Sequence, residues 1–393
     1  MQDMYLNPAA KTWSTPVSPS GTGLDTTPTN ANSASSGPET RSPNQPAKPN
    51  QAVGSDLAAG DPRVLHRALP GFAATPLVEV PELAKEFGVG RVLVKDEHVR
   101  AGLPSFKVLG AAWAVFRALG GTSGTLDDLD VDPATTLVSA TAGNHGRAVA
   151  YIARVLGVGA HIFIPAGTAP ARIEAIRSEG AMVDVVDGDY ALAVDLAEKR
   201  AASDEKALFA QDVGDSMTPI WAVQGYRTVL HEIDEQLAGT APDLVVVPVG
   251  AGVFASTVVQ HYRADGARPG ILAVEPDSAA CLLESLQAGE PVRVPGPHPS
   301  GMAGLNAGDV DVHAWPYLRN GIDAAVTVTD EQTHEAMRSL ASANIAAGEC
   351  GAASLAGARA FFAEQKLGPD AVVVLISTEG VHDQASYEAI VNR

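Results

Sequence analysis

From residue 61 onward, short apolar runs rich in β-branched residues alternate with alanine-rich segments of helical period. Strands that are apolar on both faces are typical of a parallel sheet covered by helices on each side. Parallel strands need long crossover connections, and the intervening segments are long enough to be helices. The alternation therefore predicts an α/β fold with mostly parallel sheets. The expected strands are 92–94, 136–139, 161–164, 182–186, 244–249, 271–275 and 372–377.

The chain carries 46 acidic and 27 basic residues among its 393, which gives a formal net charge of −19. This excess of negative charge opposes binding to the phosphate backbone of nucleic acids and to anionic membranes. We therefore expect a small-molecule substrate, and neither a nucleic-acid nor a membrane partner.

Only two cysteines occur, Cys281 and Cys350, and no histidine accompanies either at the spacing of a metal site. They predict neither a disulfide framework nor a bound metal, and both are expected to be reduced. The chain does not open with a basic segment followed by an apolar run, and no apolar stretch reaches the roughly 18 residues of a membrane span. We therefore expect a cytoplasmic protein.

Residues 14–60 consist mainly of Ser, Thr, Pro, Asn, Gly and Ala, with few large apolar side chains. Burial of so little apolar surface cannot offset the entropy lost on ordering, so we predict a disordered low-complexity insert. Residues 1–13 include Tyr5 and Trp13. We expect this segment to dock onto the body of the protein with the insert as a tether. The alternative is that the first 60 residues are all tail.

One lysine, Lys107, stands where a charged side chain is badly placed for structure alone. It follows a turn at 102–104 and opens a segment whose apolar residues are too numerous for one face, so we expect a helix buried on most sides. The helix macrodipole and apolar surroundings both disfavour a cation there, which predicts a lowered pKa for this amine. Such an amine is a candidate Schiff-base nucleophile. A side chain that reaches out to solvent fits the segment equally well.

Three predicted strands end in loops with unusual residues, and ligand sites in open α/β sheets lie beyond the carboxyl ends of strands. The first loop, 139–146, has small residues that let the backbone approach a ligand closely. Asn144 brings a donor and an acceptor to a helix start there. We expect His145 beside it to be packed and hydrogen-bonded rather than catalytic. An ordinary strand-to-helix turn is the alternative for this loop.

The second loop lies between a strand and a helix and contains Gly250, Ala251, Gly252 and Val253. Consecutive amides freed by glycine form a nest that suits a phosphate, whereas a dinucleotide fingerprint would require a third glycine. The third loop contains Ser377 and Thr378. A hydroxyl at that strand end can face a ring nitrogen, although taken alone the loop would more often be a plain turn.

The order and spacing of these features resemble the tryptophan-synthase-β-like, fold-type II pyridoxal-phosphate enzymes, and among them the diaminopropionate ammonia-lyase family. The matching motifs cover nearly the whole chain outside the insert. They are Asn7-Pro8-Ala9-Ala10, His66-Arg67, Thr75-Pro76-Leu77, Lys95-Asp96-Glu97, Arg100, Gly102-Leu103-Pro104-Ser105-Phe106-Lys107, Gly143-Asn144-His145-Gly146-Arg147, Gln211-Asp212, Trp221, Gln224-Gly225-Tyr226, Met302-Ala303-Gly304-Leu305-Asn306 and Ser377-Thr378-Glu379-Gly380.

This resemblance implies two open α/β lobes with the cofactor in the cleft between them. The large, cofactor-binding lobe would comprise 61–107 and 191–393, and the small lobe 108–190. Lys107 would bind pyridoxal 5′-phosphate covalently, and Asn144 would hydrogen-bond its phenolic oxygen. The loop 250–253 would hold the phosphate group.

Ser377, with Thr378 as the alternative, would face the pyridine nitrogen of the cofactor. Unlike an aspartate, a hydroxyl partner does not keep that nitrogen protonated, which favours elimination over transamination. The implied reaction is elimination of ammonia from 2,3-diaminopropionate to give pyruvate and a second ammonia. Lys107 would remove the α-proton as a general base, and Asp212 would be the carboxylate beside the leaving amine. A solvent-facing Asp212 is the structural alternative.

One position departs from the family motif, because Ala142 stands where the family has an aspartate before Gly-Asn-His. This departure puts the second catalytic acid in doubt. Related serine and threonine dehydratases have small residues there, so elimination of water from a hydroxy amino acid is the enzymatic alternative. A ligand-binding protein without catalysis that kept the fold is the alternative from another class. A homodimer is expected, since it is usual for this fold.

Overall fold

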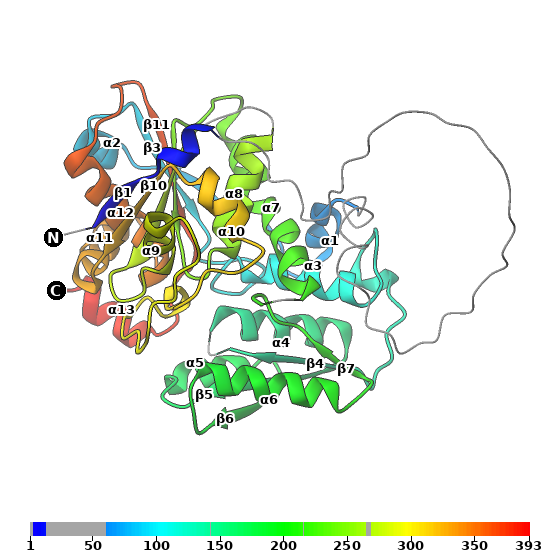
Figure 1. Cartoon of the computed structure of the whole chain (residues 1–393). Helices are drawn as coiled ribbons and strands as arrows, with labels where there is room; N and C mark the ends of the chain where they lie inside the picture. Colours follow the sequence, from blue (N-terminus) through cyan, green and yellow to red (C-terminus); the bar gives the residue numbers. More distant parts are fainter. Residues whose placement is uncertain (1–2, 13–59, 142, 215, 265–268) are drawn as a thin grey trace, which may run out of the picture.

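The computed structural model describes residues 3–12, 60–141, 143–214, 216–264 and 269–393. Apart from residue 60, the insert expected at 14–60 lies outside these ranges, as do Trp13 and Ala142. The described part of the chain forms two lobes, each built on one β-sheet (Figure 1). This confirms the α/β fold with mostly parallel sheets that the alternating pattern predicts.

The larger sheet contains seven strands within the described ranges, in the order β1-β10-β9-β8-β11-β3-β2. Its central strands are parallel, whereas β1 and β2 run antiparallel at the two edges. In spatial order the strands are β1 Met4–Leu6, β10 Ala324–Val328, β9 Gly270–Pro276, β8 Leu244–Pro248, β11 Val372–Ser377, β3 Arg91–Asp96 and β2 Leu77–Glu79.

The interior strand β11, which lies between β8 and β3, is buried along its whole length and contributes to two hydrophobic cores. Val374 and Ile376 pack into the core that contains α8, while Val373 and Leu375 pack into the core that contains α12. Successive side chains of a strand point to opposite faces, so a strand apolar at every position needs helices on both sides. The near-continuous apolar run of β11 is therefore explained by its place in the interior of the sheet, with helices on both faces.

The smaller sheet has the order β6-β5-β4-β7, with all described strands parallel. Its strands are β4 Thr136–Ala140, β5 Gly159–Pro165, β6 Met182–Val186 and β7 Ala207–Phe209. Because β7 pairs with β4, the segment 191–209 belongs with the smaller sheet, and the lobe boundary expected at 190 falls too early. A strand of three residues is too short to give a periodic signal.

The sequence analysis also missed β1, β2 and β10. The edge strands β1 and β2 have three residues each. The strand β10 begins with Ala324 and Ala325, and alanine is a poor predictor of strands.

The helices cover both faces of the larger sheet and of the smaller one, and α3, α4 and α7 lie between the two sheets (Figure 1). The α-helices are α1 Pro62–Ala68, α2 Pro81–Phe87, α3 Lys107–Ala118, α4 Asn144–Leu156, α5 Pro170–Arg177, α6 Tyr190–Ala202, α7 Met217–Leu237, α8 Val253–Ala264, α9 Cys281–Ala288, α10 Trp315–Gly321, α11 Asp330–Ser342, α12 Glu349–Glu364 and α13 Gln384–Val391. The short 3-10 helices in the described part of the chain are η1 Pro8–Thr12, η3 Leu126–Asp128 and η4 Ala303–Leu305. No helix in the described ranges has the length and apolar character to cross a membrane.

Two glycines bring α3 and α7 into close contact. A Cβ atom on Gly110 of α3 would lie 2.4 Å from the ring of Tyr226, and one on Gly225 of α7 would lie 2.5 Å from the carbonyl oxygen of Leu109. Only glycine permits this approach. The residues of α3 from Val108 to Arg117 are all buried, which confirms the prediction of a helix enclosed on most sides.

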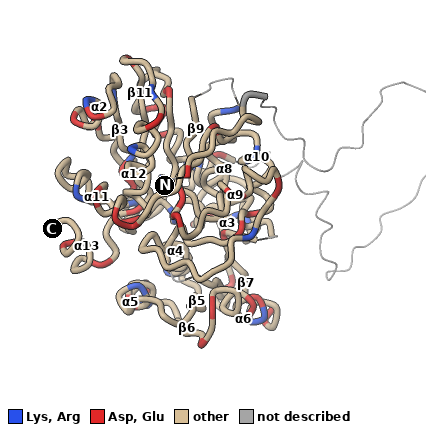
Figure 2. The backbone as a smooth tube through the Cα atoms, turned by 60° about the vertical axis from the view of Figure 1, so that its left-hand side comes forward, with Lys and Arg blue, Asp and Glu red and all other residues tan. Residues whose placement is uncertain are grey.

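The N-terminal residues lie against the larger lobe. Strand β1 pairs with β10, and the side-chain amide of Asn7 donates hydrogen bonds of 2.8 Å to the carbonyl oxygens of Arg319 and Ile322. Lys and Arg residues are scattered over both lobes rather than gathered on one face (Figure 2).

Candidate active site

Lys107 is the first residue of α3, and its side chain reaches a loop of the other lobe. Its Nζ atom lies 2.6 Å from Oδ2 of Asp212, which follows β7. The side chain of Asp212 is only 8% exposed, whereas that of Lys107 is 28% exposed. The two residues predicted as catalytic are therefore in direct contact. The alternative of a solvent-facing Asp212 is wrong, and Lys107 is held by an ion pair.

The ion pair determines the charge state of both groups. Burial acts to lower the pKa of Lys107, but its interactions with Asp212 and Tyr226 together raise that pKa above its ordinary value. The lowered pKa predicted for this amine is thus wrong, because the helix segment alone did not reveal the carboxylate. Burial acts to raise the pKa of Asp212, but His145 and Lys107 lower it to about 2. Asp212 is therefore ionised at neutral pH.

His145 packs beside this pair. Its Nδ1 atom lies 3.5 Å from Oδ2 of Asp212, and its Nε2 atom lies 2.8 Å from the carbonyl oxygen of Ala210. A carbonyl can only accept, so Nε2 carries the proton of the neutral ring. Burial lowers the pKa of His145. The residue is packed and hydrogen-bonded, as we predicted.

Gln211 fixes the loop that carries Asp212. Its side-chain oxygen accepts hydrogen bonds from the hydroxyl of Ser139 at 2.8 Å and from the amide of Ala140 at 3.1 Å. Its side-chain nitrogen donates to the carbonyl oxygen of Ala140 at 3.0 Å. These bonds tie the end of β7 to the end of β4, and they give the glutamine before Asp212 a structural role.

Three aromatic rings lie around Lys107. The ring of Phe106 is 4.8 Å from that of Tyr226 and 4.3 Å from that of Phe254. The Nζ atom of Lys107 lies 5.7 Å from the centre of the Tyr226 ring, within the range of a cation–π contact. Phe254 follows Val253 directly, so these rings join Lys107 to the predicted phosphate loop. Sequence reasoning missed Phe254, and its position beside the glycines was the available signal.

The predicted phosphate loop, 250–253, connects β8 to the start of α8, where unpaired backbone amides favour an anion. Gly252 has a φ of +90°, a left-handed conformation that favours glycine. A Cβ atom on Gly250 would lie 3.0 Å from the carbonyl oxygen of Gly304. The loop therefore packs directly on the segment 302–306, and its glycines are required by its shape.

Asn144 is the first residue of α4, and its side chain crosses to the larger lobe. Its Nδ2 atom donates a hydrogen bond of 2.5 Å to Oε2 of Glu379, whereas its Oδ1 atom is buried and has no partner among the described residues. Glu379 also accepts hydrogen bonds from Nε2 of His382 at 3.0 Å and from the amide of Cys350 at 3.2 Å. Sequence reasoning did not assign Glu379 to the site, although its place after β11 was the signal.

Ser377 ends β11, and its hydroxyl is fully buried without a partner among the described residues. Thr378, the alternative, is also buried. A Cβ atom on Gly351 would lie 2.7 Å from Oγ of Ser377, so the first turn of α12 packs closely on this strand end. An unsatisfied buried hydroxyl costs about 1–3 kcal/mol. A ligand that bonds to Ser377 would remove that cost.

The residues present fit pyridoxal phosphate. The site offers an amine on Lys107, buried oxygens on Asn144 and Ser377 that have no partner among the described residues, and a loop at 250–253 that is predicted to bind an anion. Ser105, two residues before Lys107, forms a β-bridge with Glu379. Glu379 in turn accepts a hydrogen bond from Asn144, so the segment that carries Lys107 is linked to Asn144. The parts that were predicted separately are therefore connected around Lys107.

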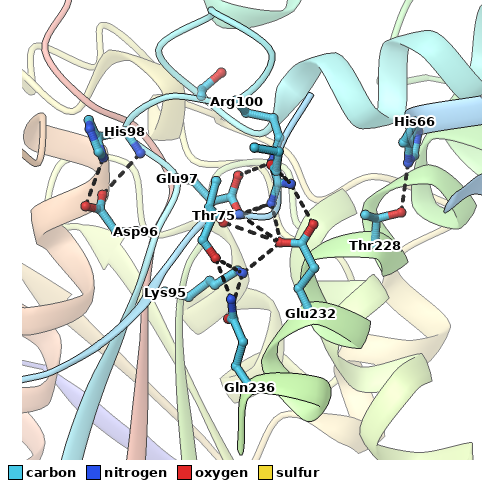
Figure 3. Close-up of polar contacts among 12 residues, drawn as sticks. His66, Thr75, Lys95, Asp96, Glu97, His98, Arg100, Thr228, Glu232 and Gln236 are labelled. Carbon is cyan, nitrogen blue, oxygen red and sulfur yellow. Dashed lines mark hydrogen bonds and ion pairs between the residues drawn. The ribbon is translucent and has the colours of Figure 1, made fainter. Parts of the chain in front are cut away.

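A buried network of four charged side chains supports the connection between β3 and α3 (Figure 3). Arg100 lies 2.6 Å from Oε1 of Glu97 through Nη2 and 2.6 Å from Oε1 of Glu232 through Nη1. Lys95 lies 2.7 Å from Oε2 of Glu232. Two positive and two negative charges balance, and Thr75 adds hydrogen bonds to both carboxylates. The network attaches the loop that precedes Lys107 to α7.

The chain is similar in sequence to known enzymes. The pyridoxal-phosphate dependent enzyme family matches residues 68–379. Diaminopropionate ammonia-lyase of Escherichia coli K12 is 33% identical over 362 residues, which cover 84% of this chain and 90% of that protein. L-threonine dehydratase of Mycobacterium bovis is 29% identical over 340 residues, which cover 84% of this chain and 73% of that protein.

Solved structures give the same relationship. The holo form of diaminopropionate ammonia-lyase from Escherichia coli matches with a TM-score of 0.77 and 31% identity, and the match covers 88% of this chain and 94% of that chain. The similarity thus extends over both lobes and over the residues gathered around Lys107.

Proposed function

Because the chain belongs to the pyridoxal-phosphate-dependent enzymes, we propose that it is a lyase that eliminates ammonia from 2,3-diaminopropionate to give pyruvate and ammonia. The observation that supports this function most strongly is the contact between Lys107 and the ionised Asp212. An elimination of this kind needs a base for the α-proton and a carboxylate for the leaving amine. The alternative of a ligand-binding protein without catalysis gives no reason for this buried pair.

The residues that would hold the cofactor are Lys107, Asn144, Ser377 and the loop 250–253. When bound, pyridoxal phosphate withdraws electrons from the α-carbon of an amino acid. The amine of Lys107 would bind it covalently, and the amides of 250–253 would receive its phosphate. Ser377 is favoured over Thr378 for the pyridine nitrogen, because the Ser377 hydroxyl is fully buried and has no partner among the described residues.

Lys107 and Asp212 then have separate tasks in moving protons. Once the substrate amine has displaced Lys107 from the cofactor, the neutral Nζ of Lys107 would remove the α-proton of the substrate. Its short distance to Asp212 would keep the resulting cation paired. The β-amino group of the substrate must be cationic to leave as ammonia, and the carboxylate of Asp212 holds that cation. A pKa of about 2 keeps Asp212 negatively charged during this step.

A substrate panel tests the function. Purified holoenzyme is incubated with L- and D-2,3-diaminopropionate, L-serine and L-threonine, and pyruvate, 2-oxobutyrate and ammonia are measured. We expect the fastest release of pyruvate from diaminopropionate, with two ammonia molecules for each pyruvate. A single ammonia per keto acid, together with faster turnover of serine or threonine, would instead identify a dehydratase.

The dehydratase is the second candidate because two observations favour it. L-threonine dehydratase of Mycobacterium bovis shares 29% identity with the chain. In addition, Ala142 replaces the aspartate that we expected from the ammonia-lyase motif. The ionised Asp212 favours the ammonia-lyase, since a leaving hydroxyl needs a proton donor rather than an anion.

We further propose a homodimeric assembly and a cytoplasmic location. Both proposals rest on the family relationship and on the composition of the chain. Light scattering of the purified holoenzyme and fractionation of the source cells would test them.

A further inference from the structure

Three potential metal ligands meet on the surface formed by α7 and α8, apart from the site around Lys107. They are His231 and Asp234 of α7 and His261 of α8. One ligand atom from each residue lies within 4.8 Å of the other two. His231 and His261 are partly buried, whereas Asp234 is exposed. The cluster therefore combines two imidazoles held by the fold with one carboxylate that is open to solution.

The packing of the two helices brings these residues together. Hydrogen bonds join Thr257 to the carbonyl of Val223 and Arg227 to Gln260, so α7 and α8 run side by side in the same direction. One turn further along α7, the ring of His231 and the carboxylate of Asp234 both contact His261. The spacing of three between His231 and Asp234 puts both side chains on one face of α7.

The contacts among the three side chains use only part of their hydrogen-bonding capacity. Nε2 of His261 lies 2.6 Å from Oδ2 of Asp234, and the rings of His231 and His261 meet edge to face with centroids 5.2 Å apart. No hydrogen bond joins the His231 ring to another described residue. A half-buried imidazole without such a bond, beside a histidine and a carboxylate, is suited to metal coordination.

We propose that His231, Asp234 and His261 bind a Zn²⁺ ion that links α7 to α8. Two imidazole nitrogens and one carboxylate oxygen are ligands that Zn²⁺ accepts, with water in the fourth position. The ion takes the place of the proton that His261 Nε2 shares with Asp234, and the His261 ring then carries its proton on Nδ1. Tetrahedral Zn²⁺ with bonds of about 2.0–2.1 Å separates its ligands by about 3.3 Å. Small rotations of the exposed Asp234 and of the rings achieve this separation.

The position of this site gives the ion a structural effect. Helix α8 begins at Val253, in the loop proposed to hold the phosphate, and α7 carries Tyr226 beneath Lys107. A metal that joins the C-terminal halves of these helices restrains both of them. We therefore expect Zn²⁺ to stabilise the holoenzyme against thermal unfolding, because it binds the folded state and not the separated helices.

The test uses holoenzyme that has been dialysed against a chelator and then freed of it. ZnCl₂ is titrated by calorimetry into the wild type and into the variants His231→Gln, Asp234→Asn and His261→Gln. We expect one equivalent per chain in the wild type and an affinity more than about tenfold weaker in each variant. His334→Gln, which removes a histidine of α11, is the matched control and keeps the wild-type affinity.

A second measurement guards against variants that are merely unstable. Zn²⁺ should raise the melting temperature of the wild type and of His334→Gln, but not that of Asp234→Asn, whose exposed side chain can be changed without disturbing a core. Absence of Zn²⁺ binding to the wild type overturns the proposal. Binding that persists at full affinity in a His231→Gln/His261→Gln double variant also overturns it, because the ion would then lie elsewhere.

Discussion

The side-chain amide of Asn144 donates a hydrogen bond to Oε2 of Glu379, although the two residues belong to different lobes. Asn144 begins a helix of the smaller lobe, and Glu379 follows β11, an interior strand of the larger sheet. The bond uses the donor of Asn144 and leaves its acceptor for another partner. Glu379 therefore orients the asparagine that we propose for cofactor binding, and it also connects the lobes.

Glu379 should make the stability of the protein depend on acid pH. Burial acts to raise its pKa, but His382, Cys350 and Arg172 lower it from 4.5 to about 2. Since the unfolded chain binds this proton more readily, the stabilisation is complete above about pH 4.5 and is lost as the pH falls towards 2. Denaturant titrations between pH 5 and pH 2.5 should show a flatter decline for Glu379→Gln than for the wild type. The exposed Glu388→Gln is the control, and parallel curves for wild type and Glu379→Gln would contradict the prediction.

Lys107 should be the site of covalent cofactor attachment. Purified holoenzyme is expected to be yellow, and reduction with borohydride should fix the cofactor on the peptide that contains Lys107. Lys107→Ala should lose turnover entirely. Peptide mapping identifies the lysine that carries the label. Lys95 serves as the comparison, because it is buried in the ionic network and should remain unlabelled. Label recovered on Lys95 would disprove the assignment.

Asp212 should affect catalysis more than cofactor binding. Asp212→Asn keeps the shape of the side chain but removes its charge, so the leaving amine loses its counter-ion. We expect turnover to fall by about 10²–10³, the usual cost of losing one positioned electrostatic group in an active site. The absorbance of the bound cofactor should remain. If the variant turns over diaminopropionate at the wild-type rate, Asp212 has no catalytic role.

Two glutamates of α7 should differ sharply in their contribution to stability. Glu232 is 7% exposed and contacts both Arg100 and Lys95, so Glu232→Gln leaves buried cations without their partner. Breaking such a pair costs about 3–5 kcal/mol. Glu235 is 63% exposed and lies 3.4 Å from Arg63, so Glu235→Gln should cost at most about 1 kcal/mol. Denaturant titration measures both values, and equal losses would refute the importance of the buried network.

Ala142 should limit the use of the D isomer of the substrate. The α-protons of the two isomers point to opposite faces of the bound substrate, and an alanine methyl group cannot accept a proton. We expect poor turnover of D-2,3-diaminopropionate and good turnover of the L isomer. Ala142→Asp should raise the rate with the D isomer. Asp212 is the competing base, so equal rates for both isomers in the unchanged protein would show that residue 142 does not determine stereochemistry.

The sequence predicted the strands that have long apolar runs and missed the strands that are too short to show a periodic pattern. The strands within 92–94, 136–139 and 244–249 were recognisable because long apolar runs mark a buried parallel sheet. The strand β7 was missed because three residues give no period, and this error moved the lobe boundary. Local patterns therefore identified the strands better than the lobes.

For the candidate site too, local features could be predicted from the sequence, whereas effects that depend on contacts between the lobes could not. Lys107, Asn144 and the loop 250–253 could be identified because each stands at the end of a predicted strand or the start of a helix. The raised pKa of Lys107 could not be predicted, since it depends on a carboxylate brought from the other lobe. The cluster of His231, Asp234 and His261 was equally hidden, because helix packing, not sequence spacing, places His261 opposite α7.

The place of β11 in the larger sheet constrains how this chain is made. Strand β11 lies between β8 and β3, yet the ribosome synthesises it after both of them. Until β11 emerges, β3 and β8 each keep an open edge, and such edges promote aggregation of nascent chains. The same strand ends in Ser377. A nascent chain that lacks β11 therefore has neither a continuous larger sheet nor all the residues proposed to hold the cofactor. The exposed edges of β3 and β8 are therefore the places where an incomplete chain can aggregate.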